Sequence, residues 1–228
     1  MNLKVKRSPV DRINAKCLWI EDLKEHCELN EKSSILDLGC GQGYLARALS
    51  LKFGSQLKYL GLDPVAKNIE KAKRYSIRQY DFEQINVYNS TYNVSGEKRY
   101  AELWPLVKHK IDLAVMFSVV THIPYEETLH YVKELTNVIS KGNIFITAYF
   151  FGKYDPNEKS KFTFPYVVNE NQRIQFEDRP AEVVAVNELS LKKELEECGW
   201  KNIKIVYGEW RRDRKARHSQ DFIVANKG

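Results

Sequence analysis

The stretch SILDLGCGQGYLARALS, residues 34–50, decides the fold. It starts with a short apolar run, passes through glycines at alternate positions, and continues with the apolar spacing of a helix. This order predicts a buried strand, a tight turn and a helix. The glycines are Gly39, Gly41 and Gly43, and without a Cβ they let the backbone approach a ligand closely. We therefore expect the turn to lie in a ligand site.

The rest of the chain repeats this alternation. Apolar runs predict strands in the segments KYLGLD, SIRQYDF, KIDLAVMFSVV and NIFITAYFF, and a final hairpin built from KNIKIVYG and QDFIVANK. Amphipathic runs predict helices over 43–53, 64–75, 124–140 with Gly142 at its end, and 190–200 with a Ser190 cap. Such alternation indicates an α/β fold of the Rossmann-like type. We expect a mostly parallel sheet with helices on both faces and an antiparallel hairpin at its carboxyl-terminal end.

The chain has 228 residues, of which 43% are apolar and 29% charged, as in a single globular domain. We expect an N-terminal helical cap, a ligand-binding core, a substrate lid, and a last helix with its hairpin, over residues 1–33, 34–151, 152–188 and 189–228. No apolar run approaches the roughly 18 residues of a membrane span, and the basic amino terminus lacks a secretory pattern. The oligomeric state is not indicated.

Two further compositional features bear on location and partners. Four scattered cysteines make neither a C-x-x-C pair nor a zinc spacing, which indicates reduced thiols in a cytoplasmic protein. The net charge is +6, and the segment EWRRDRKARHS, residues 209–219, has five basic and two acidic residues and so carries +3 of it. A basic excess of this kind suits an anionic partner.

Two acidic residues narrow the choice between a dinucleotide and other ligands of such a turn. The dinucleotide fingerprint is G-x-G-x-x-G, and here the third glycine comes one place early. Asp37, just before the turn, would repel a pyrophosphate but suits the ammonium and sulfonium of S-adenosylmethionine (SAM). Asp63 ends the next strand, beside the turn, where a carboxylate can accept both ribose hydroxyls. An alternative for Asp63 is a helix cap before Pro64.

At this point the chain resembles a known family. ILDLGCGQGYLARAL followed by YLGLDPVAKNIEKAK is similar to the first two motifs of class I SAM-dependent methyltransferases. The resemblance implies SAM as cofactor, with S-adenosylhomocysteine (SAH) as product. It places Asp37 and the three glycines at the methionine moiety and Asp63 at the ribose. The neighbouring residues expected to border the cofactor are Tyr44, Pro64, Phe117 and Ser118.

The adenine contact has two alternatives. The family often has an acidic residue at the end of the third strand, which favours Asp81, with Phe82 beside it. If the third strand is instead QINVYNS, then Asn89 or Ser90 takes this role. With the first alternative, residues 83–110 form an insertion that contains a helix over 100–110.

A histidine follows the central strand. MFSVVTHIP resembles the S-V-F-T-H-L segment of bacterial small-molecule and sugar methyltransferases, which makes His122 our candidate general base. Its alternative roles are capping, packing or a contact with the cofactor. The segment lacks the [DNS]-P-P-[YF] motif of base amine methylation, a nearby cysteine for cytosine methylation, and the acidic residues that hold Mg²⁺. We therefore expect no metal.

The basic segment supplies candidate substrate residues. It resembles the carboxyl-terminal hairpin of surface-glycan methyltransferases, where a Q-D pair, here Gln220 and Asp221, opens the last strand. Arginine forks can bind phosphate or carboxylate, and a tryptophan can stack on a sugar or a base. The candidates are Trp210, Arg211, Arg212 and Arg214, together with Tyr149 after the fifth strand. The alternative is a solvated or internally paired hairpin.

These observations predict methyl transfer to a hydroxyl of a sugar, glycan precursor or other small polar anion. The positive charge keeps an RNA methyltransferase as the first alternative, although the chain has no recognisable RNA-binding appendage. Methylation of nitrogen on a small molecule and a non-catalytic SAM-binding protein are further alternatives. The misplaced third glycine disfavours a nucleotide-dependent oxidoreductase.

Overall fold

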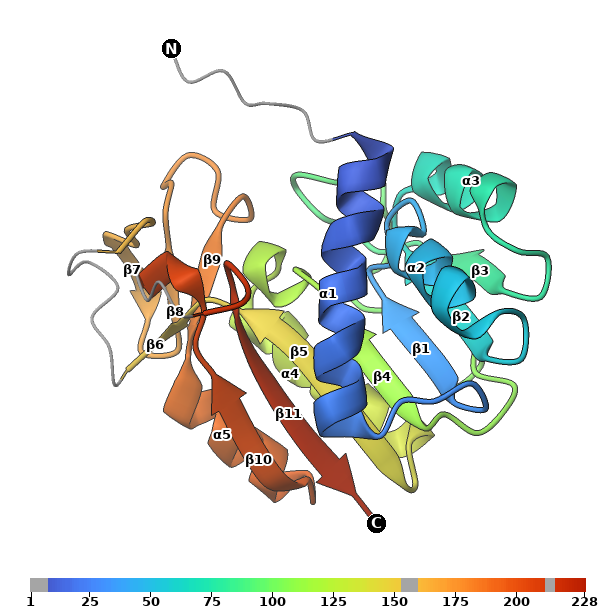
Figure 1. Ribbon diagram of the computed structural model, residues 1–228. Coiled ribbons are helices and arrows are strands. Elements are labelled where there is room, and N and C mark those ends of the chain that lie inside the picture. Colours follow the sequence, from blue (N-terminus) through green and yellow to red (C-terminus); the bar gives the residue numbers. More distant parts are fainter. Residues whose placement is uncertain (1–7, 153–159, 212–215) are drawn as a thin grey trace.

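The computed structural model describes residues 8–152, 160–211 and 216–228. The strands of its central sheet are β1 (Ser34–Leu38), β2 (Lys58–Asp63), β3 (Asp81–Gln84), β4 (Leu113–Met116), β5 (Gly142–Ala148), β10 (Lys201–Val206) and β11 (Asp221–Lys227). They lie in the order β10-β11-β5-β4-β1-β2-β3 (Figure 1). Strands β1 to β5 pair in parallel, and β11 is antiparallel to both β5 and β10. The predicted fold class and terminal hairpin are confirmed.

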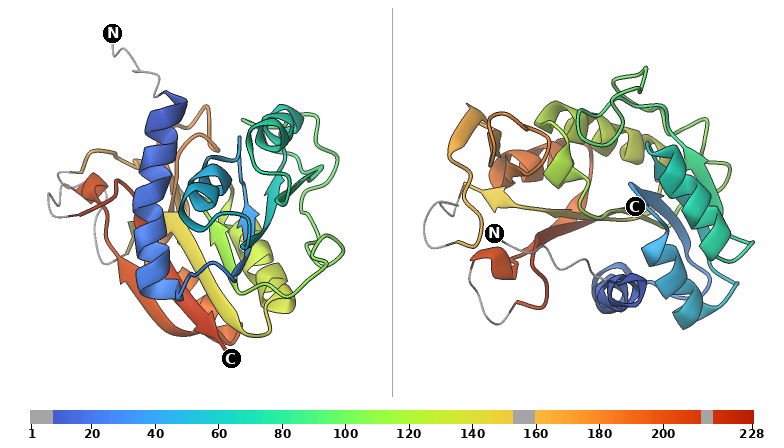
Figure 2. Two further views of the ribbon diagram at one scale, coloured as in Figure 1. Left: turned by 45° about the vertical axis from the view of Figure 1, so that its right-hand side comes forward. Right: turned by 90° about the horizontal axis from the view of Figure 1, so that it is seen from above.

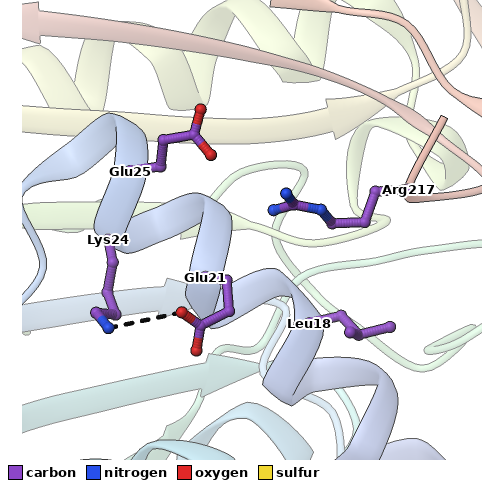
Figure 3. A pocket seen from close by; sticks show the side chains of 5 residues that line it. All are labelled: Leu18, Glu21, Lys24, Glu25 and Arg217. Atoms are coloured by element: carbon purple, nitrogen blue, oxygen red, sulfur yellow. Dashed lines mark ion pairs between the residues drawn. The ribbon is translucent and has the colours of Figure 1, made fainter. Parts of the chain in front are cut away.

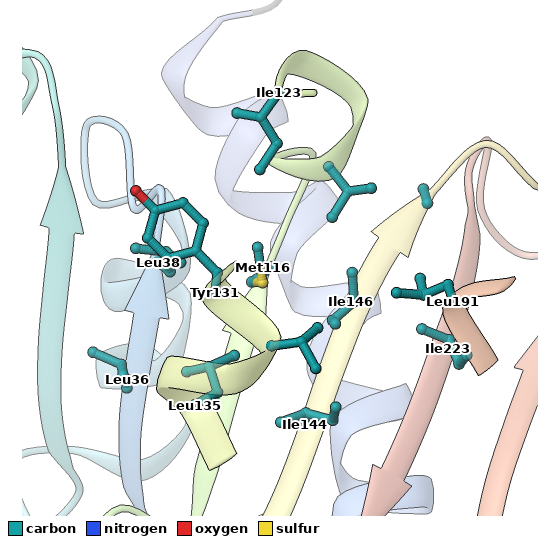
Figure 4. Packing of buried hydrophobic residues seen from close by; sticks show 14 of the residues in the cluster. Leu36, Leu38, Met116, Ile123, Tyr131, Leu135, Ile144, Ile146, Leu191 and Ile223 are labelled. Carbon is teal, nitrogen blue, oxygen red and sulfur yellow. The ribbon is translucent and has the colours of Figure 1, made fainter. Parts of the chain in front are cut away.

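Helices cover both faces of this sheet (Figure 2). On one face lie α1 (Pro9–Cys27), α2 (Tyr44–Phe53) and α3 (Ala66–Tyr75); on the other lie α4 (Tyr125–Val138) and α5 (Glu188–Glu197). Side chains of β1 alternate between the two faces. Leu36 and Leu38 join the buried cluster under α4 and α5 (Figure 4), whereas Ile35 joins the cluster under α1 and α2. The same alternation turns Asp37 toward the α1 face.

Helix α1 has a well-defined start. Ser8 and Asp11 form a reciprocal capping box, and Pro9 occupies the first turn, where its missing N–H costs nothing. Farther along, Trp19, Ile20 and their neighbours are buried against α2 and β5. This helix lies within residues 1–33, where the sequence predicts a helical cap.

A second, smaller sheet follows β5. It contains β6 (Phe150–Phe151), β7 (Tyr166–Asn169), β8 (Gln172–Ile174) and β9 (Val184–Asn187), in the order β6-β9-β8-β7. The sequence analysis expects a substrate lid over residues 152–188, so β7, β8 and β9 are missed, whereas β6 falls at the end of the predicted strand NIFITAYFF. Because β6 begins directly after β5, the small sheet starts at the carboxyl edge of the central sheet (Figure 1).

Three predicted boundaries are wrong. The side chain of Asn187 accepts hydrogen bonds from two amides in the first turn of α5, so this helix begins before Ser190. Residues 100–110 are all described and form no helix, because Pro105 removes a backbone donor in their middle. Gly142 begins β5 and does not end α4.

Two other findings concern the chain as a whole. Within the described residues, no helix combines the length and the apolar character that crossing a membrane requires. All four cysteines are described, and each is a free thiol.

Candidate active site

The glycine turn joins β1 to α2 at the carboxyl edge of the sheet (Figure 1). The amides of Gly39 and Cys40 donate to the Leu62 carbonyl at 2.7 and 2.9 Å, which ties the turn to β2. A Cβ on Gly39 would lie 2.4 Å from Val119 Cγ2, so a side chain there has no room. At Gly41, with φ +55°, no described atom lies within 4 Å of a Cβ position. The open side of the turn is therefore a cradle for a ligand.

The turn ends at the start of α2. Gly43 is the N-cap residue and Tyr44 is the first helical residue. The guanidinium groups of Arg12 and Arg47 lie 5.4 and 4.4 Å from the centre of the Tyr44 ring. Free amides at a helix start attract anions, and the two arginines add positive charge nearby. This end of the cradle therefore suits a carboxylate.

Asp63 lies beside the turn, as the strand register requires. Its side chain is buried, and one carboxylate oxygen accepts from the Gly41 amide at 2.8 Å. The other oxygen accepts from the Val65 amide and from the Asn68 side chain, both at 3.0 Å. A carboxylate has about four acceptor positions, so it retains capacity for hydroxyl donors. Because Val65 is the N-cap residue of α3, Asp63 does not cap that helix directly.

Asp37 is a buried carboxylate with capacity for a positive group. The Tyr59 hydroxyl donates to one oxygen, and the other oxygen has no hydrogen-bond partner among the described residues. Burial raises the pKa of Asp37 to about 6, against the opposing effects of Tyr59 and of the Lys16 charge. An unpartnered buried acceptor is costly unless a donor reaches it. The ammonium of a bound ligand would supply that donor.

Lys16, on α1, is a site residue that the sequence analysis missed. Its ammonium lies 4.1 Å from the centre of the Phe117 ring, and burial lowers its pKa to about 8 despite the attraction of Asp37. Lys16 precedes the buried Trp19 and Ile20 by three and four residues, which puts it on the same face of the helix. That helical spacing is the signal that could have found it.

The predicted adenine residues lie at the wrong end of their strand. Asp81 begins β3 and pairs with Leu60, whereas Asp63 at the carboxyl end of β2 pairs with Gln84. Asp81 is exposed, and Phe82 is buried with its ring 5.5 Å from that of Tyr59. The adenine assignment of both residues is therefore wrong, because β3 starts later than the sequence suggests.

Asn89, the other adenine candidate, has its side chain engaged elsewhere. Its amide nitrogen donates to the His122 carbonyl at 3.0 Å. Its amide oxygen accepts from the amides of Thr91 and Tyr92 at 2.9 and 3.0 Å. The side chain thus holds the loop in shape, and Ser90 lies beside it in the same loop.

A polar network lies where β4 and β5 end. Ser118 follows Phe117 with a left-handed φ of 60°, which is uncommon outside glycine and frequent at functional sites. Its amide donates to Thr147 Oγ1 at 2.7 Å, and its hydroxyl donates to Gln220 Oε1 at 2.8 Å. Thr147 donates to the same oxygen at 3.0 Å, and Gln220 also bonds the Tyr149 hydroxyl. Gln220 thus joins β11 to this network.

His122 ends a short 3₁₀ turn that leads away from Ser118. Its Nδ1 lies 3.3 Å from the Ala181 carbonyl oxygen. A carbonyl can only accept, so we assign the proton of the neutral ring to Nδ1, which leaves Nε2 basic. Burial lowers the pKa of His122, against the smaller raising effect of the carbonyls of Ala181 and Glu182. The ring is therefore neutral at physiological pH and able to take up a proton.

The basic hairpin does not provide the predicted substrate contacts. Trp210 is completely buried among aromatic residues that include Tyr149. Arg211 forks onto Asp221 at 3.2 and 3.1 Å and also donates to the Phe150 carbonyl at 2.7 Å. Both residues are therefore structural, and their assignment to substrate binding is wrong. Arg212 and Arg214 lie outside the described residues.

A hollow lies on the outer face of α1 (Figure 3). It measures about 590 Å³ and is lined by Leu18, Glu21, Lys24, Glu25 and Arg217. Glu21 and Lys24 form an ion pair of 3.5 Å within it. None of the predicted cofactor residues lines this hollow, so we do not assign it to the cofactor.

Three residues near the end of α1 could in principle meet at a metal ion: Asp22, Glu25 and His26. Asp22 already accepts from Arg217 at 3.0 Å and pairs with His218. Arg217 and His218 thus occupy the position that a cation would take at Asp22. The sequence-based expectation that the reaction uses no metal stays a prediction.

A family model described as a methyltransferase domain matches residues 12–205. The chain belongs to this methyltransferase family. Within the family match lie the glycine turn, both buried carboxylates and His122. The methyltransferase also has the mostly parallel sheet with an antiparallel carboxyl-terminal hairpin that the sequence led us to expect.

Solved structures share the fold of this methyltransferase. Magnesium protoporphyrin IX methyltransferase from Synechocystis PCC 6803, with bound SAH, has 13% identity and a TM-score of 0.58, covering 100% of this chain and 90% of the other. A SAM-dependent methyltransferase from Clostridium acetobutylicum ATCC 824 has 16% identity and a TM-score of 0.58, covering 99% and 94%. Human N-acetylserotonin methyltransferase, in complex with SAM, has 17% identity and a TM-score of 0.55, covering 98% and 58%.

Proposed function

We propose that this methyltransferase transfers the methyl group of SAM to a hydroxyl of a small polar acceptor. The observation that carries the proposal is an open glycine cradle between two buried carboxylates, with a neutral histidine following the adjacent β4. The resemblance of MFSVVTHIP to sugar methyltransferases favours a sugar-type acceptor, and the net charge of +6 favours an anionic one. We keep the proposal that it acts in the cytoplasm, where free thiols stay reduced.

The residues of the cradle fit SAM from one end to the other. The unpartnered oxygen of Asp37 can accept from the ammonium group, and the Lys16 ammonium can attract the carboxylate. Asp63 can accept the ribose hydroxyls. Phe117 and Ser118 border the same region, at the end of β4. When bound, SAM supplies an electrophilic methyl group.

His122 serves as the general base in this proposal. Nε2 takes up the proton of the acceptor hydroxyl, while the Ala181 carbonyl holds the proton on Nδ1 and fixes the ring. The lowered pKa keeps the ring in its basic form at neutral pH. Ser118 and Tyr149 lie just beyond the carboxyl ends of the neighbouring strands β4 and β5, so they are our candidates for orienting the acceptor.

The acceptor class is tested with labelled SAM and cell extract separated into RNA, protein, glycan and small-molecule fractions. We expect label in the glycan or small-molecule fraction, with no transfer by Asp63→Ala. Chemical cleavage of the product distinguishes a methyl ether from a methylated amine. Label in RNA, or on nitrogen, would contradict the proposed acceptor and favour the corresponding alternative.

The role of His122 is tested on the acceptor so found. We expect His122→Ala to lower kcat by about 10²–10⁴-fold, the usual contribution of a general base, with SAH affinity kept. The wild-type rate should rise as pH rises through a pKa below 6.5, the ordinary value for histidine, because the base must be unprotonated. The matched control is His130→Ala, since His130 also sets a ring nitrogen against a carbonyl. Normal turnover in His122→Ala would leave positioning alone to drive the reaction.

A further inference from the structure

A small cavity opens next to the proposed ribose site. It has a volume of about 60 Å³ and lies between the first glycine of the turn, Gly39, and Pro64, the residue after Asp63. Its walls include the apolar side chains of Ile85 and Val119. These residues come from the carboxyl ends of β1 to β4, so the cavity belongs to the same edge of the sheet as the cradle.

The position of this cavity fits the base of the cofactor. The inference rests on the proposed function, in which Asp63 binds the ribose. The base is bonded to the ribose, so it must lie against a surface adjacent to Asp63. A flat aromatic base suits apolar walls above and below, but its amine edge needs a hydrogen-bond acceptor once it leaves water. The acidic residue that β3 supplies in the resembled family is missing from this position, because Asp81 lies at the other end of β3.

The polar residues of the cavity can be compared one by one. Asn89 lines it, but its side chain is committed to three backbone groups. Tyr131 also lines it, and its hydroxyl is hydrogen-bonded to the backbone of Ala101. Tyr88 lines it as well, but its side chain is exposed to solvent and carries no charge. Glu127, in the first turn of α4, is the acidic residue of the lining. Within the described part of the chain, the structure gives its carboxylate no hydrogen-bond partner.

The position of Glu127 is central. It also lines a second cavity of about 110 Å³, which extends toward Gln172 and Pro180, so the two hollows meet at Glu127 and the adjacent Tyr88 and Asn89. Burial raises the pKa of Glu127 to about 7, with Glu126 raising it further and Arg99 opposing the shift. A half-buried carboxyl group is less well solvated than one in water, and a bound donor would offset part of that loss.

We propose that Glu127 is the specificity-determining residue for the adenine base, accepting a hydrogen bond from its exocyclic amine. A carboxyl oxygen accepts from that amine whether or not the group is protonated. Hypoxanthine carries a carbonyl oxygen where adenine carries the amine. Above the Glu127 pKa of about 7 the ionised carboxylate can only accept, so hypoxanthine then presents an acceptor to an acceptor. The site therefore selects SAM over its deaminated form through a helix residue in place of a strand residue.

The test compares the binding of SAH and S-inosylhomocysteine by isothermal titration at about pH 8.5, where the Glu127 carboxyl is mostly ionised. We expect the wild type to prefer SAH by about tenfold or more, the factor that one hydrogen bond to a charged group commonly supplies. Glu127→Ala should weaken SAH binding and bring the ratio near one. Glu127→Gln, which keeps the shape, should also lower the ratio, because an amide can turn to accept from the amine or donate to the carbonyl.

The controls are Glu126→Gln, an exposed carboxylate in the same turn, and Asp81→Asn on β3. Both should leave the ratio unchanged, and a merely structural effect of Glu127 would weaken the two ligands equally. An unchanged ratio in both Glu127 variants, with SAH still bound, would overturn this inference and leave the proposed function intact. Failure of the wild type to bind SAH would overturn the proposed function and the inference together.

Discussion

Two opposite charges removed from water decide the chemistry of the cradle. Burial raises the pKa of Asp37 to about 6 and lowers that of Lys16 to about 8, since desolvation disfavours each charged form. The attraction between the two charges favours the ionised form of each group and so opposes part of both pKa shifts. The ionised pair therefore exists mainly between these two values, which includes neutral pH.

This pair predicts a pH dependence of cofactor binding. Lys16 loses its proton as pH rises through about 8, and with it the attraction for the carboxylate of SAM. SAH affinity of the wild type should therefore fall between about pH 7 and about pH 9. Lys16→Met should bind more weakly at pH 7 and lose most of this fall, whereas Lys24→Met, on the exposed side of α1, should behave as wild type. Calorimetric titration with SAH across this pH range measures the affinities. If the SAH affinity of Lys16→Met fell with pH as steeply as that of the wild type, Lys16 would not be the group that attracts the carboxylate.

The residues that the sequence could place were those fixed by strand register. Asp63 follows from two adjacent parallel strands, each ending at the same edge. The position of Asp81 could not be predicted in this way, because SIRQYDF has the composition of a strand but begins with a turn. In this turn the Tyr80 amide donates to the Ile77 carbonyl at 3.2 Å. The turn delays β3 until Asp81. Local composition cannot reveal such a shift.

At the scale of elements, the terminal hairpin shows how a basic segment can be structural. The Asp221 carboxylate accepts from Arg211 and also from the amides of Gly208 and Phe150. Its side chain is 0% exposed and that of Arg211 is 7% exposed. This ion pair joins the loop between β10 and β11 to the start of the small sheet. From sequence alone, an arginine that holds two elements together is indistinguishable from one that awaits a substrate.

Replacing Arg211 or Arg217, both in the segment between β10 and β11, should have unequal effects on stability. Arg211→Ala leaves Asp221 buried without its ionic partner, so it should destabilise the protein by about 3–5 kcal/mol. Arg217→Ala removes a side chain that is 50% exposed, and it should cost no more than about 1 kcal/mol. Urea unfolding followed by circular dichroism measures both. Equal stability of the two variants would mean that the Arg211–Asp221 pair does not anchor the loop.

At the scale of the whole molecule, the sheet depends on β11. This strand lies between β5 and β10 and pairs with both along its length. Its apolar residues also enter the core on both faces, with Ile223 in one cluster and Phe222 in the other. The alternation of strands and helices in the sequence predicted a sheet with helices on both faces. The predicted terminal hairpin accounts for β11, the strand antiparallel to β5. Strands β7, β8 and β9 of the small sheet escaped prediction because each is only three or four residues long and β7 has no buried residue.

The inner position of β11 can be tested by truncation. A chain ending after Ser219 should lose its cooperative thermal transition, since β10 then has no neighbour and both core clusters open. A chain ending after Asn226 keeps most of the pairing with β5 and should unfold cooperatively. Circular dichroism during heating distinguishes the two. A sharp transition in the shorter chain would show that the other strands form a stable sheet without β11.

The order of β10 and β11 also bears on biosynthesis. The ribosome makes β10 before β11, yet β10 contacts the sheet only through β11. A nascent chain that has just completed α5 and β10 therefore carries a strand with two open edges, the kind of surface that invites aggregation. During this interval the open strand edges would be a binding site for a chaperone. The interval ends when β11 leaves the exit tunnel and pairs with β5 and β10.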